Sequence, residues 1–284
     1  MQRVVFAGGL GVFAAALLGL LLTGHAEVRP SPDADTAISV WGALLPPLAA
    51  MALIRLVPPR APAIRLPAVG GLGVLVAVAV AFPSLWYAVE LAGVDDDLTG
   101  PLYVLTKPVA FLLLPWLILR ATGDRPLLPV PEGERLWLAR GAWRWWAAIP
   151  ALAVFFTLFL FGPLAGPLPD AAGLPPAAEL AVIATLTFLT ANVTEELFYR
   201  VALQSRLEQA YGRWPAIVAS ALFFAFMHLP NHGQGTLATT LAAIVVFQGA
   251  FGLMTGYLWA RYRNVWVLVA AHTLSNTAPL LFAT

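Results

Sequence analysis

Long apolar stretches separated by short polar breaks dominate the chain. A membrane-spanning helix needs about 20 predominantly apolar residues, and nine stretches of roughly that size can be placed along the sequence. They run over residues 4–23, 37–56, 66–91, 102–119, 147–164, 180–203, 215–229, 237–260 and 265–282. The pattern predicts an all-α fold, a polytopic transmembrane helical bundle of about nine spans.

The composition supports a membrane protein and excludes several classes of function. Of the 284 residues, 60% are hydrophobic and 11% are charged, whereas soluble domains carry about 25% charged residues. The formal net charge of +1 offers no basic field that would attract nucleic acid. The chain has no cysteine, which excludes disulfides, thiolate metal centres and thiol nucleophiles. We therefore expect the lipid bilayer, and no nucleic acid, as a partner.

The arginines near the ends of the spans predict the orientation. Basic residues concentrate on the cytoplasmic side of membrane proteins, and Arg29 stands alone on one side of the nine-span arrangement. The other side holds 13 arginines, namely Arg3, Arg55, Arg60, Arg65, Arg120, Arg125, Arg135, Arg140, Arg144, Arg206, Arg213, Arg261 and Arg263. This bias predicts a cytoplasmic N-terminus and an external C-terminus.

The first apolar stretch has two interpretations. Arg3 precedes it and small residues follow it, as in a secretory signal. Its apolar run of about 20 residues exceeds the 7 to 15 of a typical signal core, which favours an uncleaved helix. Cleavage would leave the rest of the topology unchanged.

A segment rich in proline, arginine and tryptophan separates the fourth and fifth stretches. Trp and Arg beside an apolar span are typical of a segment at the lipid headgroup level. We divide the chain there, into N-terminal transmembrane helices with a cytoplasmic interfacial segment (1–146) and a C-terminal helical core (147–284).

The sixth stretch carries charges inside an otherwise apolar helix. Each charged group costs about 2.5 to 3.5 kcal/mol at the centre of a spanning helix, so compensation is required. Glu196 and Arg200 are four residues apart and can form an ion pair within the helix. Glu195 is rotated by about 100° from Glu196 and lacks that local partner. A desolvated carboxylate of this kind suits a general base or acid.

The spacing places other polar residues at the same membrane depth. Glu196 lies 16 residues before Gly212 and His228 lies 16 residues after it, so a hairpin turning at Gly212 puts both about 24 Å from the turn. His272 and Glu195 each lie about 12 Å from the cytoplasmic ends of their helices. Asn276 follows His272 on the same helix face.

Structural interpretations compete with catalytic ones at these positions. A single intramembrane histidine often serves as a hydrogen-bonding residue between helices, and a Glu–Arg pair is often a structural clamp. Gly252 and Gly256 form a GxxxG pattern, which favours close helix packing. Asn192 and Tyr199 lie near the face of Glu195 and are weaker candidates for orienting it.

Taken together, these residues resemble a known family. Glu195-Glu196-x-x-x-Arg200, Phe224-x-x-x-His228 and His272-x-x-x-Asn276 occur in this order on late spans. This set is similar to the signature of the CPBP family of intramembrane proteases, also called the CAAX prenyl protease and bacteriocin-processing, or ABI, family. The likeness covers roughly residues 180–284, so the family core lies in the last four spans.

The resemblance implies a glutamate-dependent intramembrane endopeptidase in a bacterial or archaeal cell membrane. Glu195 and His228 would activate a water molecule, while His272 and Asn276 would stabilise the oxyanion of the tetrahedral intermediate. Glu196 and Arg200 would support this arrangement. The expected substrate is a membrane-associated peptide or protein, and neither a metal nor another cofactor is expected.

Two alternatives stay open on the sequence. Glu195, His228 and His272 could act as ligands of a catalytic zinc ion, since two histidines and one glutamate form an acceptable set. The HExxH motif of many zinc proteases is absent. Intramembrane Glu and His also occur in transporters and their proton relays, so a non-catalytic transporter or a peptide-binding immunity protein is the second alternative.

Overall fold

The computed structural model describes residues 1–29, 36–57, 70–123, 145–230 and 235–283. The first helices are α1 (Gln2–Leu22), α2 (Val40–Leu56), α3 (Leu72–Leu91), α4 (Asp96–Pro108) and α5 (Leu114–Ala121). A short π-helical turn, η1 (Val109–Leu113), joins α4 to α5. Two two-residue strands, β1 (Glu27–Val28) and β2 (Ile38–Ser39), pair antiparallel between α1 and α2.

The second half of the chain is also helical. It comprises η2 (Trp145–Ala148), α6 (Ile149–Phe161), η3 (Ala171–Gly173), α7 (Ala177–Thr187), η4 (Phe188–Val193), η5 (Glu196–Gln204), α8 (Ser205–Tyr211), α9 (Arg213–Phe226), α10 (Leu237–Tyr262) and α11 (Val265–Leu281). The prediction of an all-α helical bundle is confirmed.

Helices occupy all nine apolar stretches found in the sequence. Five helical runs in the described part of the chain are long and apolar enough to cross a membrane: Gln2–Leu22, Leu72–Leu91, Leu98–Ala121, Ala177–Tyr211 and Leu237–Tyr262. The other four apolar helices have 10 to 17 residues. The protein is therefore an integral membrane protein, while the count of nine spans stays a prediction.

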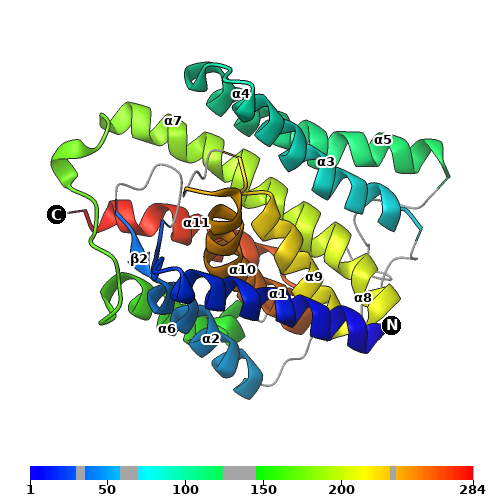
Figure 1. Cartoon of the computed structure of the whole chain (residues 1–284), viewed down its shortest axis with the longest axis horizontal. Helices are drawn as coiled ribbons and strands as arrows, with labels where there is room; N and C mark the ends of the chain where they lie inside the picture. The colour runs from blue at the N-terminus through cyan, green and yellow to red at the C-terminus, as the bar shows by residue number, and fades with distance from the viewer. Residues whose placement is uncertain (30–35, 58–69, 124–144, 231–234, 284) are drawn as a thin grey trace.

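The long helix α10 lies near the middle of the bundle (Figure 1). It contacts α1, α2, α9 and α11, and the GxxxG glycines allow close approach, as predicted. A Cβ atom at Gly252 would lie 3.1 Å from the Cα atom of Ala221 on α9. This packing holds α9 and α11, two of the predicted site helices, against a common support.

Helices α7 and α8 belong to one helical run of 35 residues that contains the two π-helical segments η4 and η5. Thr194 follows η4 directly, and its hydroxyl donates to the carbonyl of Leu189, five residues earlier. Glu195 lies between the two π-helical segments. Such turns are common at functional sites.

The predicted hairpin at Gly212 is present. Gly212 adopts a φ of +82°, a conformation that glycine tolerates better than other residues, and α9 begins at the next residue. Helix α9 then packs back against α8 and η5.

Helices from the first half of the chain complete the bundle. Helices α3, α4 and α5 cover one side of the run from α7 to α8 (Figure 1), while α2 and α6 pack together near α10. The division into 1–146 and 147–284 stays a prediction, and the interfacial segment predicted around Pro126–Arg144 lies outside the described residues.

Candidate active site

Glu196 and Arg200 form the predicted ion pair inside η5. The Nε atom of Arg200 lies 3.2 Å from Oε2 of Glu196, and both side chains are fully buried. Nη1 of Arg200 donates to Oγ of Ser220 at 3.2 Å, and the guanidinium carbon lies 4.5 Å from the ring centroid of Phe224. The pair therefore fixes η5 to α9, as well as compensating the two charges.

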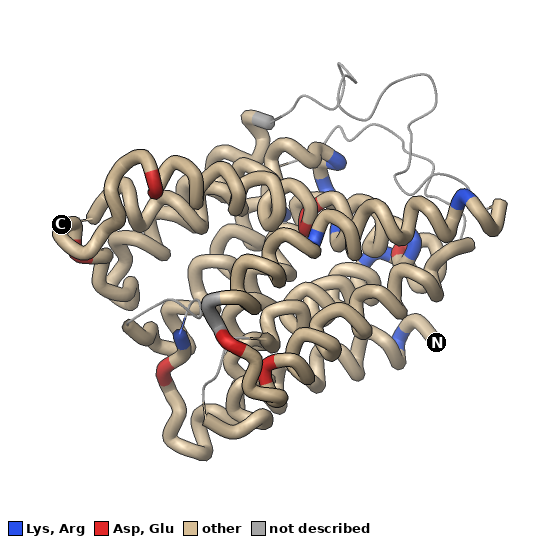
Figure 2. The backbone as a smooth tube through the Cα atoms, turned by 90° about the horizontal axis from the view of Figure 1, so that it is seen from above, with Lys and Arg blue, Asp and Glu red and all other residues tan. Residues whose placement is uncertain are grey.

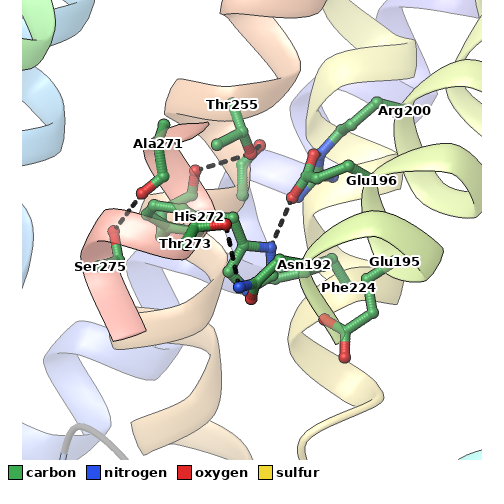
Figure 3. Close-up of polar contacts among 12 residues, drawn as sticks. Asn192, Glu195, Glu196, Arg200, Phe224, Thr255, Ala271, His272, Thr273 and Ser275 are labelled. Carbon is green, nitrogen blue, oxygen red and sulfur yellow. Dashed lines mark hydrogen bonds and ion pairs between the residues drawn. The ribbon is translucent and has the colours of Figure 1, made fainter. Parts of the chain in front are cut away.

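His272 approaches the second glutamate rather than the first. Its Nδ1 atom lies 3.0 Å from Oε1 of Glu196 (Figure 3). The Asn264 side chain caps the start of α11 by accepting hydrogen bonds from two backbone amides, and the buried His272 follows two turns later. Helix spacing predicts only a common depth for His272 and Glu195, so the direct contact with Glu196 is a feature of the tertiary structure.

Glu195 has a partner that the sequence analysis did not identify. Its side chain points away from the contact between Glu196 and His272 (Figure 3), and its Oε1 atom lies 2.7 Å from Nζ of Lys107 on α4. The sequence predicts that Glu195 has no partner of the Glu196–Arg200 kind within its own helix, and its ion-pair partner is indeed on another helix. The Oε2 atom is buried and accepts no hydrogen bond from the described residues.

His228 lies two residues beyond the end of α9 and is half-buried. Its Nδ1 atom lies 2.9 Å from the carbonyl oxygen of Phe224. Because a carbonyl only accepts hydrogen bonds, this contact places a hydrogen on Nδ1. A neutral ring then carries its lone pair on Nε2.

The two imidazoles converge near Glu195. Both His228 and His272 lie close enough to act electrostatically on the Glu195 carboxylate. The ring of Phe224 lies between them, with centroid distances of 4.9 Å to His228 and 5.8 Å to His272. The Glu195 side chain is 1% exposed, so it does not face lipid. The common depth that the helix spacing predicts for these three residues stays a prediction.

The side chain of Asn276 contacts another amide. Its Nδ2 atom donates to Oδ1 of Asn192 at 2.7 Å, and Nδ2 of Asn192 donates to Oγ1 of Thr273 at 3.0 Å. This chain of hydrogen bonds links α11 to η4. Asn192, a weak candidate for orienting Glu195, is therefore a partner of Asn276.

The described residues hold no group of three or more His, Cys, Asp or Glu side chains arranged to bind a metal ion. Glu195 and His272 instead contact Lys107 and Glu196, respectively. The expectation of a cofactor-free site stays an expectation.

Sequence reasoning missed two contributors to this site, Lys107 and Ser220. A signal existed for Lys107, because it is the only lysine in the chain and lies within the apolar stretch 102–119. A charged residue inside a predicted span indicates a functional site, and this holds for Lys107 as it does for Glu195. Ser220 is an ordinary small residue of a helix, and no feature of the sequence distinguishes it.

Residues 176–278 match the family model described as type II CAAX prenyl endopeptidase, Rce1-like. No curated protein and no solved structure gives a match. The matched range begins beside α7 and ends within α11. It contains all six residues selected from the sequence, whereas Lys107 lies outside it.

Proposed function

Because residues 176–278 form a domain of the Rce1-like type II CAAX prenyl endopeptidase family, we propose that the protein is an intramembrane endopeptidase whose general base is Glu195. One observation carries this proposal. Glu195 is a buried carboxylate whose Oε1 binds the Lys107 ammonium, whereas its Oε2 accepts no hydrogen bond from the described residues. The imidazoles of His228 and His272 act on it electrostatically.

The reaction consumes one water molecule. Oε2 of Glu195 accepts a proton from water, the oxygen of the water bonds to the carbonyl carbon of the peptide, and the C=O electron pair moves onto oxygen. Collapse of this tetrahedral oxyanion breaks the C–N bond, and the proton passes from Glu195 to the leaving nitrogen. The products are a new carboxyl end and a new amine end, and Glu195 is restored.

His228 and His272 support different parts of this reaction. Nε2 of His228 accepts a hydrogen bond from the attacking water and orients it. In the proposed step the His272 ring is an imidazolium, in which Nδ1–H donates to Glu196 and Nε2–H donates to the oxyanion. The same carboxylate–imidazole relationship orients the histidine of a Ser-His-Asp triad.

Asn276 is the second donor to the oxyanion. Its contact with Asn192 uses one hydrogen of the Nδ2 amide group, and the other hydrogen serves the oxyanion. Preorganised donors of this kind contribute about 2.7 to 4 kcal/mol each to catalysis. Arg200 acts as a positioning residue, because its guanidinium binds both the Glu196 carboxylate and the Ser220 hydroxyl of α9.

The substrate belongs to the bilayer environment. The family description names CAAX prenyl peptides as substrates of this class, and we propose a membrane-associated peptide or protein that enters from the cytoplasmic leaflet. Basic residues gather toward the end of the bundle that carries the N-terminus (Figure 2), which supports the proposed cytoplasmic N-terminus.

The orientation has a direct test, because the chain has no cysteine. Arg213 lies at the hairpin turn with its side chain 50% exposed, so Arg213→Cys introduces a single reactive thiol. A membrane-impermeant maleimide should label it in inverted vesicles and not in intact cells. Labelling of intact cells would contradict the orientation.

The two alternative functions are not favoured. A zinc ion bound by Glu195 would place a second positive charge beside the Lys107 ammonium, which already lies 2.7 Å from Oε1. A transporter typically shows two related halves, whereas the polar contacts of this site gather on helices α4, η4, η5, α9 and α11.

Comparative proteomics of membranes tests the proposed function. Cells that carry the native protein or Glu195→Gln are compared for an uncleaved precursor, and we expect it to accumulate only with the variant. Glu179→Gln is the matched control, because Glu179 lies in α7 of the same helical run and is exposed. Equal processing in cells with native protein and cells with Glu195→Gln would overturn the assignment.

A further inference from the structure

Helix α4 brings two side chains to the active site from outside the matched family range. Tyr103 and Lys107 are four residues apart and share one face of α4. Nζ of Lys107 lies 2.7 Å from Oε1 of Glu195 and 4.7 Å from the ring centroid of Tyr103. The Tyr103 hydroxyl donates to the carbonyl oxygen of Met227. One face of α4 therefore contacts both Glu195, the proposed base, and Met227, the residue that precedes His228.

The Lys107 ammonium is held firmly in this position. The residue is 7% exposed, and a buried ammonium requires an anionic or hydrogen-bonding partner. The Tyr103 ring is itself stacked against Phe82 at a centroid distance of 5.4 Å, and Phe82 packs against Phe111 at 4.8 Å. This aromatic packing joins α4 to α3 and η1.

The contact distinguishes the two oxygens of Glu195. Oε1 receives the ammonium at 2.7 Å, whereas Oε2 is buried and has no hydrogen-bond partner among the described residues. A carboxylate held at one oxygen cannot exchange its two oxygens by rotation without breaking the ion pair.

We propose that Lys107 is a positioning residue that binds Oε1 of Glu195 and so presents Oε2 to the attacking water. This inference rests on the proposed function. During the reaction the ammonium keeps its protons, the Oε2 atom takes and returns the water proton, and the ion pair is the same before and after turnover. Tyr103 fixes the segment that carries His228 relative to the same helix.

Three variants of the full-length protein in phospholipid vesicles test the role of Lys107. The probe is an internally quenched, farnesylated peptide that ends in Cys-aliphatic-aliphatic-Met. We expect Lys107→Met to lower kcat at least about 10- to 100-fold. Misplacement of a catalytic group by about 1 Å has effects of this size, and a Glu195 that becomes neutral without its cation can no longer accept the water proton. KM should change less than about twofold, since Lys107 does not contact the substrate, and Lys107→Arg should recover part of the lost kcat. Leu105→Met, on the exposed face of α4 (Leu105 is 52% exposed), is the matched control.

The outcomes separate the inference from the proposed function. If the native protein cleaves the peptide, Glu195→Gln does not, and Lys107→Met keeps at least half of the native kcat, the inference is wrong while the function stands. If Glu195→Gln cleaves as well as the native protein, or if the native protein cleaves neither this peptide nor any precursor in the membrane comparison, the proposed function is wrong.

An infrared measurement tests the ion pair without any substrate. A buried carboxyl group that loses its cation becomes neutral. Lys107→Met should therefore show a carbonyl stretch of a protonated carboxyl that is absent from the native protein and from the double variant Lys107→Met/Glu195→Gln. Identical carboxyl spectra for native protein and Lys107→Met would overturn the inference, whatever the activity.

Discussion

Nδ1 of His272 lies 3.0 Å from Oε1 of Glu196, and this contact joins the last helix of the bundle to the centre of its longest helical run. The preceding residue, Glu195, directs its carboxylate to Lys107 instead. Two adjacent carboxylates therefore serve different partners. In the proposed reaction, the first acts on water and the second holds an imidazole.

We expect Glu196→Gln to impair both stability and turnover. The substitution keeps the shape of the side chain but leaves the fully buried Arg200 without its anionic partner. Breaking a buried ion pair in this way costs about 3 to 5 kcal/mol, and the change also removes the acceptor for Nδ1 of His272. Thermal unfolding in detergent, followed by tryptophan fluorescence, should show a lower Tm than in the Glu179→Gln control. An unchanged Tm would show that the pair does not stabilise the bundle.

Asn192 and Asn276 should act as one unit in catalysis. Removing an oxyanion donor lowers kcat about 100- to 1,000-fold, so we expect a loss of that size for Asn276→Ala. Asn192→Ala should give a smaller loss, because it removes the acceptor that orients the Asn276 amide. In the double variant the two losses should not multiply, since both act through the same amide. Fully multiplicative losses in kcat would contradict this coupling.

The contact between α9 and α10 should not tolerate a larger residue at Gly252. A Cβ atom at this position would lie 3.1 Å from Cα and 3.2 Å from Cβ of Ala221, and overpacking of this kind costs about 1 to 3 kcal/mol. We expect Gly252→Val to lower both the Tm and the activity. Gly11→Val, where an added Cβ meets nothing within 4 Å, is the matched control and should leave both unchanged. Equal effects of the two substitutions would argue against the close contact.

The end of α10 offers a test of backbone strain. Arg263 has a φ of +52°, and one of its nitrogens lies 2.7 Å from each carboxylate oxygen of Glu208. Arg263→Ala and Arg263→Gly both remove this ion pair and should lower the Tm. The alanine variant should be less stable than the glycine variant by about 1 kcal/mol, because only glycine adopts this conformation without a steric penalty. The reverse order in thermal unfolding would contradict the assignment.

The sequence determined the features that depend on distance along a helix. Apolar length located the helices, and the spacing from Glu196 to Arg200 indicated their ion pair. Equal spacing around Gly212 predicts one depth for the carboxylates and His228. Each of these inferences needs only a helical rise and the position of a turn, which are local properties. The motif residues also indicated the family whose model matches residues 176–278.

Only the tertiary structure decided which side chains meet. The direction in which a helix presents a residue depends on its packing, and the π-helical turns on both sides of Glu195 rotate its neighbours in a way that the residue pattern does not reveal. Lys107 is visible in the sequence as a lone cation in an apolar stretch, yet its pairing with a carboxylate 88 residues later follows from how α4 packs against η4. The contact of His272 with Glu196 rather than Glu195 was settled in the same way, by the rotation of two helices about their axes.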